Sequence, residues 1–478
     1  MLFNSLDFAI FLPTVFFLYW FVLNKNIEKQ NILILIASYF LYGWWDWRFL
    51  SLILFRTLVD YSIGIFLAKE ERIKQRKFLL YTSLIVNLGL LGFFKYYNFF
   101  IDNFIEAFSF FGASFNLTTL KIILPVGISF YTFQTLSYTI DVYKKNLEPA
   151  KSFISFATFV SFFPQLVAGP IERASNLLPQ FYKKRIFKKE IAYDGLRQIL
   201  WGLFKKIVIA DQCAEYANLI FNNSDDYSGS TLFLGALFFT FQIYGDFSGY
   251  SDIAIGVSRL FGFNLMQNFA FPYFSRDIAE FWRRWHISLS TWFRDYLYIP
   301  LGGSRGGTWM KVRNTFIIFL VSGFWHGANW TFVVWGALNA LYFLPLLLLK
   351  KNRQNIGVIA EDSYLPTIHE FLNMLFTFLL TVFAWIFFRS NNVKHAWDII
   401  QEIFTSSIFN IPQVLPLILF VFILFFLFVE WSGRRNQYGI EKFMLHKSTW
   451  LRWGFYMFLV FCIIANINNE QDFIYFQF

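Results

Sequence analysis

Two histidines lie in stretches where an imidazole could carry out proton transfer. His326 occupies "SGFWHGANW" (322–330), inside a long apolar run. His286 occupies "FWRRWHISLSTWFRDYLYIP" (281–300), where aromatic residues alternate with arginines. A neutral imidazole can accept a proton from an attacking hydroxyl, so general base catalysis is the chemistry that these two segments suggest.

His326 has two interpretations. It is either a core histidine satisfied by a neighbour such as Ser322 or Asn329, or a functional group, because polar side chains in a bilayer usually face a cavity or the bundle interior. Gly323 and Gly327 flank it and leave room for a ligand or another backbone. Asn329 is also a candidate lining residue of a substrate tunnel.

His286 also has a structural alternative, as an interfacial histidine in an amphipathic helix. Arg283 and Arg284 lie three and two residues before it and are expected to lower its pKa, which favours a neutral ring. Trp325, beside the other histidine, is expected to supply a rigid tunnel wall and a donor N–H group.

Two carboxylates lie in a third polar stretch, "QIYGDFSGYSDIAIG" (242–256). Asp246 and Asp252 are expected either to cap helices and bond neighbouring helices or to line a substrate passage.

The composition requires these groups to be positioned by membrane helices. Of 478 residues, 56% are hydrophobic and 15% charged, against about 25% charged in soluble domains. The sequence predicts an all-α, polytopic bundle of about 11–12 spans forming a single domain over 1–478. The predicted spans are 8–23, 31–47, 49–68, 78–101, 119–140, 196–221, 231–257, 314–330, 332–349, 367–388, 412–430 and 450–467.

Two segments do not fit a simple crossing. Segment 152–170 contains "FFPQLVAGP", with two prolines and a glycine, and is predicted to be re-entrant or interfacial. Segment 259–313 is predicted to lie at the cytoplasmic face and to end in the flexible turn "LGGSRGG".

Charge and cysteine content exclude several classes of function. The net charge of +10 comes from short basic clusters between apolar runs, a pattern typical of cytoplasmic loops and not of nucleic-acid binding. Cys213 and Cys462 cannot form a disulfide framework or a metal knuckle, and two histidines without nearby cysteine or carboxylate spacing do not support a zinc site.

Several motifs occur in an order that resembles a known family. "DFSGYSDIAIG", "FWRRWHISLSTWFRDYLYIPLGG" and "SGFWHGANWTFVVWG" together resemble the membrane-bound O-acyltransferase (MBOAT) superfamily. "LPVGISFYTFQTLSYTIDVY" (124–143) and "FFPQLVAGPIER" (162–173) resemble its bacterial polysaccharide branch, which acetylates alginate or peptidoglycan. The resemblance covers the whole chain.

The resemblance implies a function and a location. The family's near-invariant catalytic histidine corresponds to His326, and its second histidine or asparagine corresponds to His286. The implied activity moves an acetyl group from cytoplasmic acetyl-CoA, with no permanently bound cofactor, to a cell-surface polysaccharide. The implied location is the cell (inner or cytoplasmic) membrane, among its lipids, with an extracytoplasmic serine-hydrolase-like acetyltransferase as partner.

Basic residues are candidates for binding the phosphates of this donor. They are Arg283, Arg284, Arg294, Arg305 and Lys311.

The aromatic tail "DFIYFQF" (472–478) is expected on the outer side. It is either an interfacial anchor or a segment that folds back and presents Tyr475 as a transient acyl acceptor, as the tyrosine-bearing small subunit of related acylation systems does.

Two rival functions are considered. D-Alanyl transfer to teichoic acid uses the same architecture. A non-enzymatic polysaccharide transporter explains the spans and the aspartates, but not the paired histidines in tryptophan-rich motifs.

Overall fold

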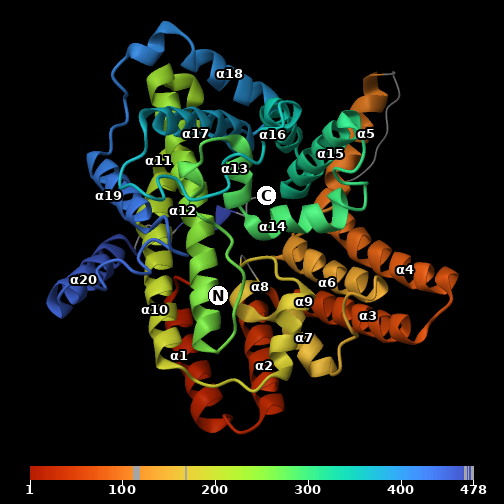
Figure 1. Ribbon diagram of the computed structural model, residues 1–478. Coiled ribbons are helices and arrows are strands. Elements are labelled where there is room, and N and C mark those ends of the chain that lie inside the picture. The colour runs from red at the N-terminus through yellow and green to blue at the C-terminus, as the bar shows by residue number, and fades with distance from the viewer. Residues whose placement is uncertain (111–118, 167–168, 468–470, 472, 475–478) are drawn as a thin grey trace. The chain divides into compact units, whose positions relative to one another are not determined.

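The computed structural model describes residues 1–110, 119–166, 169–467, 471, 473 and 474. Every regular element in these residues is a helix, which confirms the predicted all-helical class (Figure 1). The chain forms two compact units, Met1–Ala192 with Val257–Leu265, and Tyr193–Gly256 with Met266–Phe478.

The first unit is built from helices in the amino-terminal part of the chain. They are α1 (Leu6–Phe17), α2 (Ile27–Asp46), α3 (Leu50–Lys69), α4 (Ile73–Leu91), α5 (Tyr97–Phe110), α6 (Ile128–Tyr143), α7 (Phe153–Ser161), α8 (Phe163–Leu166) and α9 (Ala174–Leu177). Segment 152–170 contains two short helices, α7 and α8, and its re-entrant or interfacial placement stays a prediction. With nine and four residues, these helices are about 14 and 6 Å long.

The second unit contains the two histidines. Its helices are α10 (Lys189–Leu203), α11 (Asp211–Asn222), α12 (Gly229–Leu260), α13 (Ile278–Arg284), α14 (Ile287–Phe293), α15 (Thr308–His326), α16 (Trp330–Leu348), α17 (Ile368–Arg389), α18 (Val393–Ile403), α19 (Leu417–Gly433) and α20 (Thr449–Asn466). The unit boundary passes through α10 and near the end of α12.

Short helical turns join several of these elements. The π-helical turns are Leu18–Val22, Gly92–Tyr96, Phe204–Ala210 and Arg294–Tyr298; the 3₁₀ turns are Trp47–Phe49, Leu178–Tyr182, Ser224–Asp226, Pro272–Phe274 and Ser406–Phe409.

Five helical stretches of the described chain are long and apolar enough to cross a bilayer. They are Ile27–Lys69, Ile73–Ser109, Trp330–Leu348, Ile368–Arg389 and Thr449–Asn466. Shorter apolar helices cover Leu6–Val22, Phe153–Leu166 and Leu417–Gly433. The chain is therefore a membrane protein, while the count of 11–12 crossings stays a prediction.

Helices α15 and α16 form the tightest hairpin of the second unit, and they lie side by side in Figure 1. A Cβ atom at Gly323 would overlap the carbonyl oxygen of Phe332, and one at Gly336 would overlap that of Phe319. The two backbones are thus in direct contact. Of the two occupants predicted for the space beside Gly323, a ligand or another backbone, the structure has the backbone.

Candidate active site

His326 is the last residue of α15, where the chain turns into α16. Gly327 ends the helix with an extended backbone, and Asn329 caps the next helix by accepting a hydrogen bond from the backbone N–H of Thr331 at 3.0 Å. The Nδ2 atom of Asn329 donates to the carbonyl oxygen of Asn391 at 2.8 Å. Asn329 therefore shapes the turn after the histidine, and its role as a tunnel residue stays a prediction.

Aromatic rings enclose His326, which is 4% exposed. Its ring centroid lies 5.2 Å from those of Trp335 and Phe388 and 4.9 Å from that of Trp325. The Trp325 ring is also 6.2 Å from that of His286. The structure therefore brings the two predicted histidines to one place, with a single indole between them.

His286 lies between α13 and α14 in the left-handed region, with φ of 44°, which residues other than glycine adopt uncommonly, although histidine does so more often than most. Its Nδ1 lies 3.0 Å from Oδ1 of Asn268. That oxygen already accepts from the backbone N–H and the hydroxyl of Ser288 at 3.3 and 2.8 Å. Because an acceptor oxygen faces Nδ1, that nitrogen carries the proton, and Nε2 of the neutral ring has the lone pair.

Asn268 is a site residue that the sequence analysis missed. Its Nδ2 donates to the hydroxyl of Ser251 at 3.0 Å, which fixes the amide orientation. Nothing in "GFNLMQNFAF" (262–271) distinguishes this asparagine from Asn264, so only the fold reveals it.

Burial lowers the pKa of His286 to about 3. The predicted direction is correct, but the predicted cause is wrong, because the neighbouring arginines face other partners. Arg283 donates to the carbonyl oxygens of Asn352 and Asn355 at 2.8 and 2.7 Å. Arg284 pairs with Glu280 at 2.8 Å.

The low pKa of His286 predicts a loss of stability in mild acid. The unfolded chain protonates this ring below its ordinary pKa of 6.5, whereas the folded chain keeps it neutral down to about 3. The free energy of unfolding therefore falls as the pH drops through that window. We expect thermal melting between about pH 7 and about pH 4 to show a shallower decline for His286→Asn than for the unmodified protein. Equal slopes would contradict this assignment.

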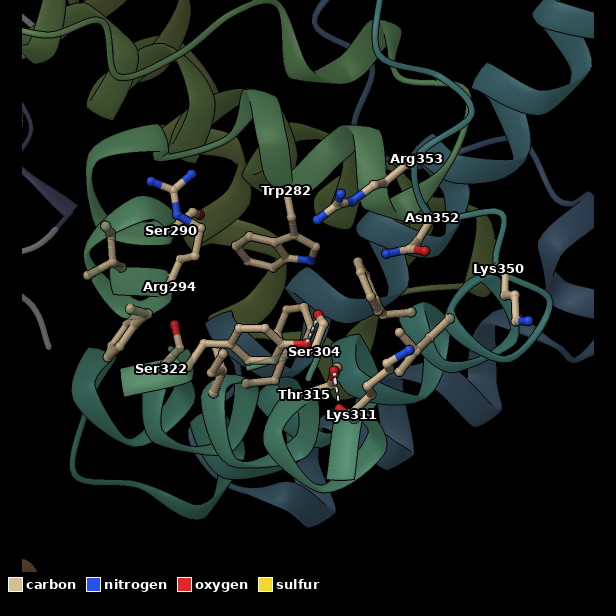
Figure 2. Close-up of a pocket in the computed structure, with 17 residues that line it drawn as sticks. Trp282, Ser290, Arg294, Ser304, Lys311, Thr315, Ser322, Lys350, Asn352 and Arg353 are labelled. Carbon is tan, nitrogen blue, oxygen red and sulfur yellow. Dashed lines mark hydrogen bonds between the residues drawn. The ribbon is translucent and has the colours of Figure 1, made fainter. Parts of the chain in front are cut away.

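A cavity of about 540 Å³ lies beside this region (Figure 2). Ligand sites in proteins usually measure about 300–1,000 Å³. The lining residues are Trp282, Leu289, Ser290, Phe293, Arg294, Tyr298, Ser304, Lys311, Thr315, Ile318, Phe319, Ser322, Phe343, Leu347, Lys350, Asn352 and Arg353.

One face of α15 connects this cavity with His326. Lys311, Thr315 and Ser322 line the cavity, and His326 follows Ser322 by four residues, so its side chain lies on the same face one turn further on. The distance along the axis from Lys311 to His326 is about 22 Å. Neither histidine lines the cavity itself. Trp282 lines it, and the Trp282 ring packs 5.6 Å from Trp335, which contacts His326.

The predicted donor-binding residues separate into two groups. Arg294 and Lys311 line the cavity, and Figure 2 shows Arg294 and Arg353 on opposite sides of Trp282. Arg283 and Arg284 make the contacts given above, and Arg305 is exposed outside the lining. Lys350 and Arg353 also line the cavity and were missed as site residues, although the sequence shows their basic cluster.

The two predicted tunnel aspartates are buried in ion pairs. Asp252 lies 2.6 Å from Nζ of Lys205, and Asp246 lies 2.9 Å from Nζ of Lys206. Neither aspartate lines the cavity of about 540 Å³. Asp252 does line a small polar pocket of about 10 Å³ together with Ser251 and Asn268, room for about one water. A place for Asp246 and Asp252 in a substrate passage stays a prediction. Tyr475 lies outside the described residues, and its role stays a prediction as well.

Comparison with known proteins identifies the family of the chain. The profile of the membrane-bound O-acyltransferase family matches residues 147–386, which include both histidines. The chain belongs to this family and is an O-acyltransferase, which confirms the resemblance and favours an enzyme over a transporter.

Similar proteins are named for the transfer of acetyl or D-alanyl groups to alginate, peptidoglycan or teichoic acid. The probable alginate O-acetylase AlgI of Pseudomonas aeruginosa is 41% identical over 417 residues, covering 87% of this chain and 77% of the relative. The peptidoglycan O-acetyltransferase of Helicobacter pylori is 36% identical over 84% of this chain and 79% of the relative. The teichoic acid D-alanyltransferase of Bacillus subtilis is 29% identical over 56% and 70%, respectively.

Proposed function

We propose that this chain O-acetylates a cell-surface polysaccharide of the alginate or peptidoglycan kind, with acetyl-CoA on the cytoplasmic side as donor. Relatives named as O-acetylases cover most of the chain at 36–41% identity, whereas the D-alanyltransferase relative matches about half of it. D-Alanyl transfer is therefore the less supported activity.

The observation that carries this proposal is the cavity along α15. Its lining combines the cations Arg294, Lys311 and Arg353 with aromatic and aliphatic side chains. A donor that carries both phosphates and an apolar thioester arm fits such a lining, because guanidinium and ammonium groups bind phosphate oxygens strongly. The face of α15 that carries Lys311, Thr315 and Ser322 then leads the thioester arm toward His326.

The reaction needs one proton acceptor at the thioester. The imidazole of His326 takes the proton of the acceptor hydroxyl while its oxygen attacks the acetyl carbonyl carbon. The new C–O bond forms, the C–S bond breaks, and the departing thiolate receives the proton back from His326. His286 stays neutral and offers Nε2 as a hydrogen-bond acceptor that can orient the attacking hydroxyl, with its ring held by Asn268.

The tail is proposed to provide the first acceptor, through the hydroxyl of Tyr475. Phe473 and Ile474, which precede it, are fully buried. The Phe473 ring lies 6.2 Å from that of Phe247, and the Phe247 ring lies 4.6 Å from that of His286. A tyrosyl ester on Tyr475 would pass its acetyl group to an extracytoplasmic transferase and then to the polymer, with the chain in the cytoplasmic membrane.

Removing the cations that line the cavity tests the donor site. We expect Arg294→Ala, Lys311→Ala and Arg353→Ala each to raise the apparent KM for acetyl-CoA by about tenfold with little change in kcat, because a lost charge-assisted contact weakens ground-state and transition-state binding alike. Arg305→Ala is the matched control, since it removes one exposed positive charge outside the lining. Equal KM values in all four variants would reject the cavity as the donor site.

A further inference from the structure

A buried ion pair contacts the backbone of the last described residues. Nζ of Lys206 donates to the carbonyl oxygen of Gln471 at 3.0 Å, and the N–H of Ile474 donates to Oδ2 of Asp246 at 2.7 Å. The two side chains also pair with each other at 2.9 Å and are 1% and 3% exposed. Both ends of the pair thus bind the same short segment.

The charge balance of this cluster explains why the segment is bound. Lys206 also lies 2.7 Å from Asp211, so one ammonium faces two carboxylates. Burying an excess carboxylate is costly unless donors solvate it. The N–H of Ile474 is such a donor, and its bond to an ionised oxygen is charge-assisted.

Aromatic packing adds to the polar contacts. The Phe473 ring lies 4.3 Å from that of Tyr250, one helical turn beyond Asp246 on α12. Lys206 itself lies in the π-helical turn Phe204–Ala210 between α10 and α11, and such turns often occur at functional positions.

We infer that Lys206 and Asp246 form a binding site for the chain's own backbone at Gln471 and Ile474. Recognition is through backbone atoms, with the neighbouring side chains of Phe473 and Ile474 filling apolar space. Lys206 and Asp246 are positioning residues. Their consequence for acetyl transfer rests on the proposed function of Tyr475, whereas the binding itself does not.

Proline at position 474 tests the site without disturbing the helices. Ile474→Pro removes the N–H that Asp246 accepts, while Ile474→Ala keeps it and trims the side chain. Hydrogen–deuterium exchange of the full-length protein in detergent should show exchange of the remaining tail amides at least about tenfold faster in Ile474→Pro than in Ile474→Ala. Asp246→Asn keeps an acceptor oxygen for the N–H of Ile474. Its amide exchange rates should therefore be closer to those of Ile474→Ala than to those of Ile474→Pro.

The outcomes separate this inference from the proposed function. Equal exchange in Ile474→Pro and Ile474→Ala would overturn the backbone site. Tail amides that exchange at the rate of free peptide in the unmodified protein would overturn it as well. Slow exchange that depends on the N–H at 474 supports the site even when Tyr475→Phe leaves polymer acetylation unchanged, a result that would reject only the acyl acceptor.

Discussion

Replacing His326 by alanine is expected to lower acetyl transfer by about three orders of magnitude, because a positioned general base contributes roughly 10²–10⁴ in rate. The loss should fall on kcat, since the ring does not line the donor cavity. Transfer of labelled acetyl groups from acetyl-CoA in detergent or in vesicles measures it. His326→Gln keeps most of the side-chain volume among Trp325, Trp335 and Phe388, and it should be equally inactive.

The control for this substitution is His446→Ala, which removes an exposed histidine distant in sequence from the motif. It should retain the full rate. Thioester cleavage that persists in both His326 variants, with unchanged melting temperature, would show that the base is elsewhere.

Tyr475→Phe is expected to reduce polymer acetylation by at least about a hundredfold while the affinity for acetyl-CoA is retained. Removing one hydroxyl deletes the proposed nucleophile, and covalent catalysis offers no substitute at that position. Mass spectrometry should detect an acetylated carboxyl-terminal peptide in the unmodified protein and none in the variant. Tyr364→Phe, at an exposed side chain, is the matched control. Full polymer acetylation by Tyr475→Phe would remove the tyrosyl ester from the mechanism.

The sequence was sufficient for the helical class and for singling out two histidines that the fold brings to one place, while their catalytic roles stay predictions. Low charge and long apolar runs admit only helices in lipid, and tryptophan-rich motifs marked His286 and His326. The prolines and the glycine of "FFPQLVAGP" also indicated that 152–170 is not one long helix, and the fold has the short helices α7 and α8 there.

Partners distant in sequence could not be predicted in the same way. Asp246 and Asp252 on α12 pair with Lys206 and Lys205 in the turn Phe204–Ala210. The sequence did contain a signal for this pairing, because one apolar segment carries the two lysines and the other carries the two aspartates, so that their charges can compensate each other. The cause of the low pKa of His286 was also missed. Adjacent arginines in sequence point toward other groups, and only the fold shows how deeply the ring is buried.

The glycine contacts between α15 and α16 have a consequence for how a donor enters. Two helices whose backbones touch have no intervening side chains to rearrange, so this hairpin acts as a fixed wall. Another part of the lining is held differently, because Arg283 donates to the carbonyl oxygens of Asn352 and Asn355 on either side of Arg353. The arginine that the sequence suggested as a phosphate ligand thus holds the segment that carries a lining cation.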